Sequence, residues 1–128
     1  MTYSFGLDSR LQDLGLRMRA FVQDSVVPHE SVLEDSAHGI PDGLRRELHE
    51  AARGAGVFGP TVPVEYGGLG LNFREQSIAL EEAGRSLIGP TAVHCAAPDE
   101  GNILLLEKVA TADQRDRFLG PLARGTAR

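Results

Sequence analysis

Apolar residues recur along most of the chain at steps of three and four, and hardly any segment alternates like a strand. This spacing is typical of helices that bury one face. The first such segment runs from about Leu7 to Val27. Its predicted buried face consists of Leu7, Leu11, Leu14, Met18, Phe21 and Val22. Pro28 should end this helix, because proline lacks an N–H and disfavours helix in the preceding residue. The polar residues 29–40 are predicted to form a loop.

A second helix is predicted from Asp42, a suitable N-cap, to about Ala55, with Gly54 and Gly56 as its stop. Its predicted buried face consists of Leu44, Leu48, Ala51, Ala52 and Ala55. The following stretch, residues 56–71, has too many glycines and prolines for a helix, yet it is too apolar for a solvated loop. We therefore expect a packed connection whose side chains cover part of the core.

A third helix is predicted from Asn72 to about Leu87, because Asn72 and Glu75 have the spacing of a capping box. Its apolar face would present Phe73, Leu80, Ala83 and Leu87. Gly89-Pro90 then interrupts the chain, and a short segment follows from Thr91 to Ala97.

Two further helices complete the pattern. One is expected at Asp99–Ala110, where the acidic first turn suits a helix N-terminus. The last begins at Thr111, where Gln114 completes a second capping box. This last helix would carry Phe118, Leu119 and Leu122. The chain as a whole is therefore predicted to be one all-α domain, a bundle of five to six helices over residues 1–128.

The composition is that of an ordinary globular domain. The chain has 128 residues, of which 41% are hydrophobic and 24% charged, and its net charge is −5. With this acidic balance we expect no nucleic-acid partner. No apolar run approaches the roughly 20 residues that span a bilayer, and residues 1–10 lack the apolar core of a secretory signal. The single cysteine, Cys95, excludes an internal disulfide, so we expect a reducing, cytoplasmic location.

Two short motifs suggest ligands but are better explained by structure. Gly67-Gly68-Leu69-Gly70 lacks the preceding strand and the glycine spacing of a phosphate-binding loop, so a structural turn is favoured. His94 and Cys95 are adjacent, and neighbours on a helix do not face the same way. The remaining histidines are His29, His38 and His49, and they complete no metal-ligand pattern. We predict no metal site, and we expect His94 to line a pocket or the core.

Paired carboxylates occur at Glu81-Glu82 and Asp99-Glu100. For Glu81-Glu82 we expect one exposed and one partly buried side chain on a helix. For Asp99-Glu100 we expect helix-terminal charge. General acid or base work would need both groups to converge on one substrate atom, and no Ser-His-Asp or Cys-His pattern is present either. The sequence therefore predicts no catalytic residue.

A series of motifs resembles the acyl-CoA dehydrogenase family. Pro63–Leu71 resembles the family's PxEYGGxGL signature, and Glu81–Arg85 resembles its EELGR helix. Thr111–Leu119 resembles its GTxxQKxRFL helix. Two further similarities lie upstream, at Phe21–Pro28 and at Ala52–Val57. Because these motifs follow one another in order, the chain is identified as similar to the N-terminal helical domain of this family.

The similarity covers about residues 10–128, with some departures. Val64 stands where the family commonly has Glu, Ala110 where it has Gly, and Gly120 where it has Pro. Ala96–Asn102 resembles a subgroup of the family that carries APDxGN there.

What the resemblance implies is a flavoprotein of fatty acid metabolism with a helical, a β-barrel-like and a second helical domain. FAD would lie between the middle and C-terminal domains, helped by a neighbouring subunit. A glutamate of the C-terminal part would remove the α-proton of an acyl-CoA while the β-hydride goes to the flavin. Residues 1–128 would be the N-terminal domain alone, without catalytic residues and with little affinity for FAD. By position, the floor of the family's acyl-chain slot falls near His94, Ala97, Pro98 and Gly101.

Alternatives stay open at this point. The domain could belong to a dehydrogenase that is completed by a downstream part, as a homo-oligomer, or by a complementary dehydrogenase chain. It could equally be a free-standing helical interaction module, and acyl-CoA oxidases and flavin monooxygenases share the same helical domain. Plain core packing is the alternative for the four slot residues. Alone, the surface that neighbours would cover should be exposed, so we expect self-association or marginal stability.

Overall fold

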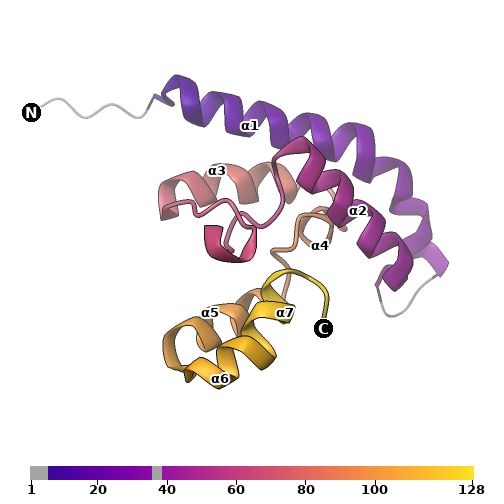
Figure 1. Cartoon of the computed structure of the whole chain (residues 1–128). Coiled ribbons are helices and arrows are strands. Elements are labelled where there is room, and N and C mark those ends of the chain that lie inside the picture. Colours follow the sequence, from indigo (N-terminus) through magenta and orange to yellow (C-terminus); the bar gives the residue numbers. More distant parts are fainter. Residues whose placement is uncertain (1–5, 36–38) are drawn as a thin grey trace, which may run out of the picture.

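All regular structure that the computed structural model describes is helical (Figure 1). The structure describes residues 6–35 and 39–128, so the predicted first helix lies within the described residues, whereas residues 36–38 of the predicted loop lie outside them. Within these ranges the all-α prediction is confirmed. No helix there is long and apolar enough to cross a membrane.

The first helix extends well beyond its predicted end. α1 (Ser9–Phe21) begins at Asp8, whose carboxylate accepts a hydrogen bond from the Leu11 amide. It continues without a break into the π-helical segment η1 (Val22–Val26) and the 3-10 helix η2 (Val27–Asp35). The predictions that Pro28 stops the helix and that residues 29–35 form a loop are wrong. Pro28 lies in the first turn of η2, where a missing N–H is tolerated.

The main core lies between α1, η1 and the helices that pack beneath them. Figure 1 shows α1 running along one side of the molecule, with α3 and α2 against it. The predicted face of the first helix is confirmed except at its start, since Leu7 is 40% exposed. The buried residues of this cluster include Leu14, Met18, Phe21, Val22, Val26, Leu48, Ala52, Val57, Phe58, Ala79, Ala83, Ile88, Ala92 and Val93.

α2 (Asp42–Ala55) has the predicted bounds, and Gly56 ends it in the left-handed conformation with a φ of +71°. Its N-cap is Pro41, and the Asp42 side chain makes ion pairs instead of capping. The predicted buried face is wrong in part, because Leu44 is half-buried while Ala51 and Ala55 are exposed. The buried residues are Arg45, Leu48, His49 and Ala52. Compared with the prediction, α2 turns its Arg45 and His49 side toward the interior, because both side chains have polar partners there.

The stretch 56–71 is a packed connection, as predicted. Val57, Phe58 and Val62 are buried, and a short 3-10 turn, η3 (Val64–Tyr66), lies within it. Gly68 passes so close to the backbone that an added Cβ would lie 2.0 Å from the Val62 carbonyl oxygen. Only glycine fits that approach.

α3 (Phe73–Ala83) begins with the predicted capping box but ends before Leu87. Its predicted apolar face is wrong apart from Ala83, because Phe73 is 89% exposed, Leu87 88% and Leu80 38%. The buried residues are Glu75, Ala79, Glu82 and Ala83. The two carboxylates can be buried because arginines pair with them, Arg10 with Glu75 and Arg19 with Glu82. Glu81 is exposed and Glu82 buried, which confirms the prediction for that pair.

The helices after α4 form a smaller, second cluster. Gly89-Pro90 opens the short α4 (Gly89–Ala92) and does not interrupt helical structure, since proline suits a first turn. α5 (Asp99–Val109), α6 (Ala112–Gln114), the π-helical η4 (Arg115–Leu119) and α7 (Gly120–Ala123) then pack on one another away from α1 (Figure 1). The core of this cluster is Val62, Ile103, Leu119 and Ala123. The capping box at Thr111 and the acidic first turn of α5 are both present as predicted.

Candidate functional site

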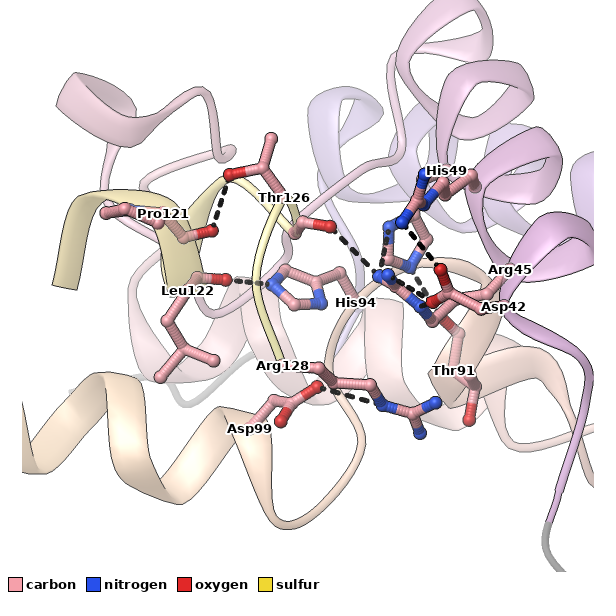
Figure 2. Close-up of polar contacts among 12 residues, drawn as sticks. Asp42, Arg45, His49, Thr91, His94, Asp99, Pro121, Leu122, Thr126 and Arg128 are labelled. Atoms are coloured by element: carbon pink, nitrogen blue, oxygen red, sulfur yellow. Dashed lines mark hydrogen bonds and ion pairs between the residues drawn. The ribbon is translucent and has the colours of Figure 1, made fainter. Parts of the chain in front are cut away.

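The end of α7 and the chain segment that follows it are held by side chains from α2 and from His94, two distant parts of the sequence (Figure 2). His94 donates from Nε2 to the Leu122 carbonyl at 2.8 Å. Arg45 donates from Nη1 to the Gly125 carbonyl at 3.0 Å, and Arg53 from Nη2 to the Arg124 carbonyl at 2.5 Å. We call these side chains, together with His49, the C-terminal clamp.

His49 connects the clamp to α4. Its Nε2 lies 2.9 Å from the Thr91 carbonyl, and its Nδ1 lies 3.4 Å from Nη1 of Arg45. Since a carbonyl only accepts hydrogen bonds, we assign the proton of the neutral ring to Nε2, which leaves Nδ1 as an acceptor facing the guanidinium. Asp42 in turn accepts from Nη2 of Arg45 at 2.7 Å and fixes that side chain. The guanidinium of the buried Arg45 therefore has hydrogen-bond partners on two sides, Asp42 on one and the Gly125 carbonyl on the other.

Both histidines are neutral near pH 7. Burial lowers the pKa of His49 to about 4, against the weaker opposing effect of its bond to Thr91. Burial also lowers the pKa of His94. The two ring centroids are 5.0 Å apart, so a charge on one ring would further disfavour a charge on the other.

Aromatic packing fixes the His94 ring. It stacks on Phe58 with centroids 5.4 Å apart and 13° between the planes, and the guanidinium of Arg53 lies 4.0 Å from the centre of the Phe58 ring. The His94 backbone has a φ of +60°, a left-handed conformation that is unusual for a residue other than glycine. His94 is therefore held in the interior, which confirms the prediction that it lines a pocket or the core.

The other predicted slot residues lie nearer the surface. Ala97 and Pro98 are exposed just before α5, joined by a cis peptide bond, and Gly101 is exposed in the first turns of α5. A Cβ added to Gly101 would meet nothing within 4 Å. His94 and Ala97 share a small cavity of about 10 Å³ with part of the clamp, whereas Pro98 and Gly101 do not line it. The structure thus brings two of the four predicted residues together.

A larger hollow of about 340 Å³ lies between α2 and the C-terminal segment. It is lined by Arg46, His49, Glu50, Arg53, Arg124, Gly125 and Thr126. Its walls carry more arginine than acid, although the chain as a whole is acidic.

The remaining motifs have structural roles. The amides of Gly68, Leu69 and Gly70 donate to the carbonyls of Pro63, Gly59 and Val62, so they are not free to bind a phosphate. This confirms the predicted structural turn. Cys95 is partly buried, and burial raises the pKa of its thiol to about 12. Among the residues that the structure describes, no group of three or more His, Cys, Asp or Glu side chains could hold a metal ion.

Comparison with known proteins identifies the fold. Residues 10–126 match the family model described as acyl-CoA dehydrogenase, N-terminal domain. The chain belongs to the acyl-CoA dehydrogenase family. It is 30% identical over 132 residues to mouse acyl-CoA dehydrogenase family member 10 and 32% identical over 123 residues to (2S)-methylsuccinyl-CoA dehydrogenase of Cereibacter sphaeroides. These matches cover 96% and 94% of this chain but only 12% and 21% of the relatives.

A solved structure agrees with this assignment. A protein assigned as an acyl-CoA dehydrogenase from Mycobacterium abscessus superposes with a TM-score of 0.78 at 30% sequence identity. The match covers 97% of this chain and 34% of that one. The fold described above is therefore that of the family's N-terminal domain, and the chain spans about a third or less of these relatives.

Within this acyl-CoA dehydrogenase domain, the sequence did not reveal three of the clamp residues. Arg45, His49 and Arg53 lie four residues apart on α2, a spacing that places them on one helix face. That spacing was the available signal. It is easily taken for a solvated charged face, because the carbonyls that accept from Arg45 and Arg53 lie more than 70 residues later.

Proposed function

We propose that this chain, residues 1–128, serves as the N-terminal helical domain of a flavin-dependent acyl-CoA dehydrogenase. It would line the acyl-chain slot and leave the α,β-dehydrogenation to the rest of the enzyme. The observation that carries the proposal is the match of residues 10–126 to the family's N-terminal domain, supported by a superposition that covers 97% of the chain.

The described residues offer little to hold FAD. The glycine-rich turn at 67–70 uses all four of its amides in backbone hydrogen bonds, and the hollow beside the clamp is small for a dinucleotide. We therefore propose that FAD is bound by the complete enzyme and not by this domain alone. The residues of this chain would exclude water and orient the acyl group.

Ala97, Pro98 and Gly101 are the residues that we propose to face the acyl chain. They are exposed in this chain, and the open space around Gly101 leaves room for a ligand. His94 would act as a positioning residue, because its ring is bonded to Leu122 and stacked on Phe58 and so holds the segment leading to Ala97. Acyl-CoA is the proposed substrate class.

Other parts of the enzyme would cover the apolar side chains that this domain leaves exposed. Phe73 and Leu87 are almost fully exposed, and Leu104, Leu105 and Phe118 are about half exposed. Surfaces of this kind mark contacts with other chains or domains. A homo-oligomer, or a complementary dehydrogenase chain, would supply the partner.

Flavin reduction tests the proposal directly. The protein should be made from its gene at natural length and purified without added flavin. Under anaerobic conditions, acyl-CoA thioesters should bleach the absorbance of a bound oxidised flavin, while free CoA should not. Purified protein that holds no flavin, and gains none when FAD is supplied, would contradict the proposed function and favour an interaction module.

A further inference from the structure

The C-terminal clamp combines two buried histidines with two arginines at the point where the chain leaves the domain. His49 and His94 are 2% and 4% exposed. The C-terminal segment lies directly on His49, because a Cβ added to Gly125 would be 2.8 Å from Nδ1 of that ring. Protonation of this ring therefore directly affects the contacts of the C-terminal segment.

Protonation of His49 is incompatible with the clamp. In the neutral ring, Nδ1 accepts from Arg45 while Nε2 donates to the Thr91 carbonyl. A charged ring would place an N–H opposite the Arg45 guanidinium, so that two donors and two positive charges would face each other. Arg45 would have to move, and with it the bond to the Gly125 carbonyl.

The surroundings of the pair supply mostly positive charge. From α2, Arg45 and Arg53 face the rings and disfavour a charge on either of them. From α5, Asp99 favours the charged form of His94, and its carboxylate is shared with Arg128 of the C-terminal segment at 3.9 Å.

The other nearby carboxylates belong to α2, and both have arginine partners. Asp42 pairs with Arg45, and Glu50 pairs with Arg53. No acid therefore faces Nδ1 of His49 among the contacts of the described residues. His94 can keep its bond to Leu122 when charged, so His49 is the main trigger.

We propose that the His49–His94 pair makes the C-terminal clamp an acid-sensitive latch. With both rings neutral, the segment Gly125–Arg128 is held against α2 through the bond from Arg45 to the Gly125 carbonyl. When the rings become protonated, this segment is released while the main core stays folded. Most of the main core lies away from the clamp, because its buried cluster is built mainly from apolar residues of α1, η1, α2, α3 and α4, and it contacts the two rings at Phe58.

The direction and size of the effect follow from linkage. His49 in the held state has a pKa of about 4, and in the released state it should return toward its ordinary value of 6.5. The released form then binds more protons, so its population grows as the pH falls through this window. The growth is at most about tenfold per pH unit for one histidine, and it levels off below about pH 4.

Amide hydrogen exchange on the 128-residue chain tests the latch. The Gly125, Thr126 and Ala127 amides donate to the carbonyls of Leu122 and Pro121 and report on the segment. Their protection factors, corrected for intrinsic exchange, should fall between about pH 6.5 and about pH 4, while the α1 amides keep theirs. Equal loss of protection in α1 would indicate global unfolding and overturn the latch.

A substitution gives the matched comparison. His49→Gln keeps a donor for the Thr91 carbonyl but cannot be protonated, so the pH dependence should largely disappear. His29→Gln, on η2, is the control and should keep it. An unchanged pH profile in His49→Gln would overturn the proposal. If that variant does not fold, the pKa of His49 can be measured in the unsubstituted chain from the ¹⁵N chemical shifts of its ring. A pKa near 6.5 would overturn the latch, and a pKa near 4 would support it.

Discussion

At the scale of single residues, neighbouring glycines of the family signature meet very different demands. Gly67 has a φ of +87° and open space around its Cβ position. Gly68 has an ordinary φ, but its Cβ would lie 2.0 Å from the Val62 carbonyl oxygen, a backbone atom that cannot move aside cheaply. The signature therefore requires glycine at these two positions for different physical reasons.

This difference predicts the outcome of two alanine substitutions. Gly67→Ala adds only the cost of a left-handed residue, about 1–2 kcal/mol of unfolding free energy. Gly68→Ala forces the 63–70 turn apart and should cost about 3 kcal/mol or more. Urea denaturation of both variants compares the two costs. Equal losses would show that steric contact at Gly68 is not what selects glycine there.

Glu82 predicts how the domain responds to acid. It is buried and accepts hydrogen bonds from Arg19 at 2.6 and 3.0 Å, and Arg85 approaches it at 2.6 Å. The bond to Arg19 is the main reason that its pKa is lowered from the ordinary 4.5. Its contribution to stability is therefore present above about pH 4.5 and is lost as the pH falls through the lowered pKa.

Substitution of Glu82 isolates this contribution. Glu82→Gln cannot ionise, so the variant should be less stable at neutral pH and should lose less stability on acidification than the original chain. Thermal unfolding at a series of pH values measures both slopes. Glu81→Gln, at the exposed neighbour, is the control and should leave the slope unchanged. Parallel pH profiles for Glu82→Gln and the original chain would contradict this account.

At the scale of helices, the ends that were predicted correctly are those with local signals. The capping boxes at Asn72 and Thr111 and the left-handed Gly56 each act within a few residues. The buried faces of α2 and α3 were predicted poorly. Their polar members depend on partners far along the chain, such as Arg19, which lies 63 residues from Glu82. The prediction from Pro28 failed for a different reason, because η1 leads directly into η2 and proline is tolerated in the first turn of η2.

The same distinction applies to the candidate site. His94 and Ala97 are three residues apart, so their proximity follows from the sequence, whereas their role at an acyl-chain slot stays a prediction. Arg45 and His49 could not, because their burial depends on a segment about 80 residues later.

The Asn72 capping box should contribute measurably to the free energy of unfolding. Asn72 accepts from the Glu75 amide at 3.0 Å, and Glu75 accepts from the Asn72 amide at 2.9 Å. Asn72→Ala should cost about 1 kcal/mol of unfolding free energy, because the Glu75 amide loses its side-chain acceptor and the reciprocal pair of hydrogen bonds is broken. Asn72→Ser keeps an acceptor and should cost much less. Chemical denaturation of both variants and the original chain checks this. Equal stability of the three proteins would show that the cap does not contribute to stability.

At the scale of the whole molecule, the exposed apolar side chains predict association. Phe73 and Leu87 are 89% and 88% exposed, and Leu105 is 57% exposed. Sedimentation velocity at increasing concentration should reveal self-association of the 128-residue chain. Phe73→Ser with Leu87→Ser should weaken it without loss of stability, because neither side chain is buried here. A monomer at all accessible concentrations would contradict the prediction.

At the same scale, we propose that this domain shapes an acyl-chain slot through Ala97, Pro98 and Gly101. Gly101 and Gly54 both lie on helices with no atom within 4 Å of an added Cβ, so leucine at either position should be tolerated. The decisive measurement is KM for acyl-CoA thioesters of increasing chain length, made on the natural-length enzyme. Gly101→Leu should raise the ratio of long-chain to short-chain KM about tenfold or more, while Gly54→Leu leaves it unchanged. A ratio in Gly101→Leu equal to that of the unsubstituted enzyme would contradict the account.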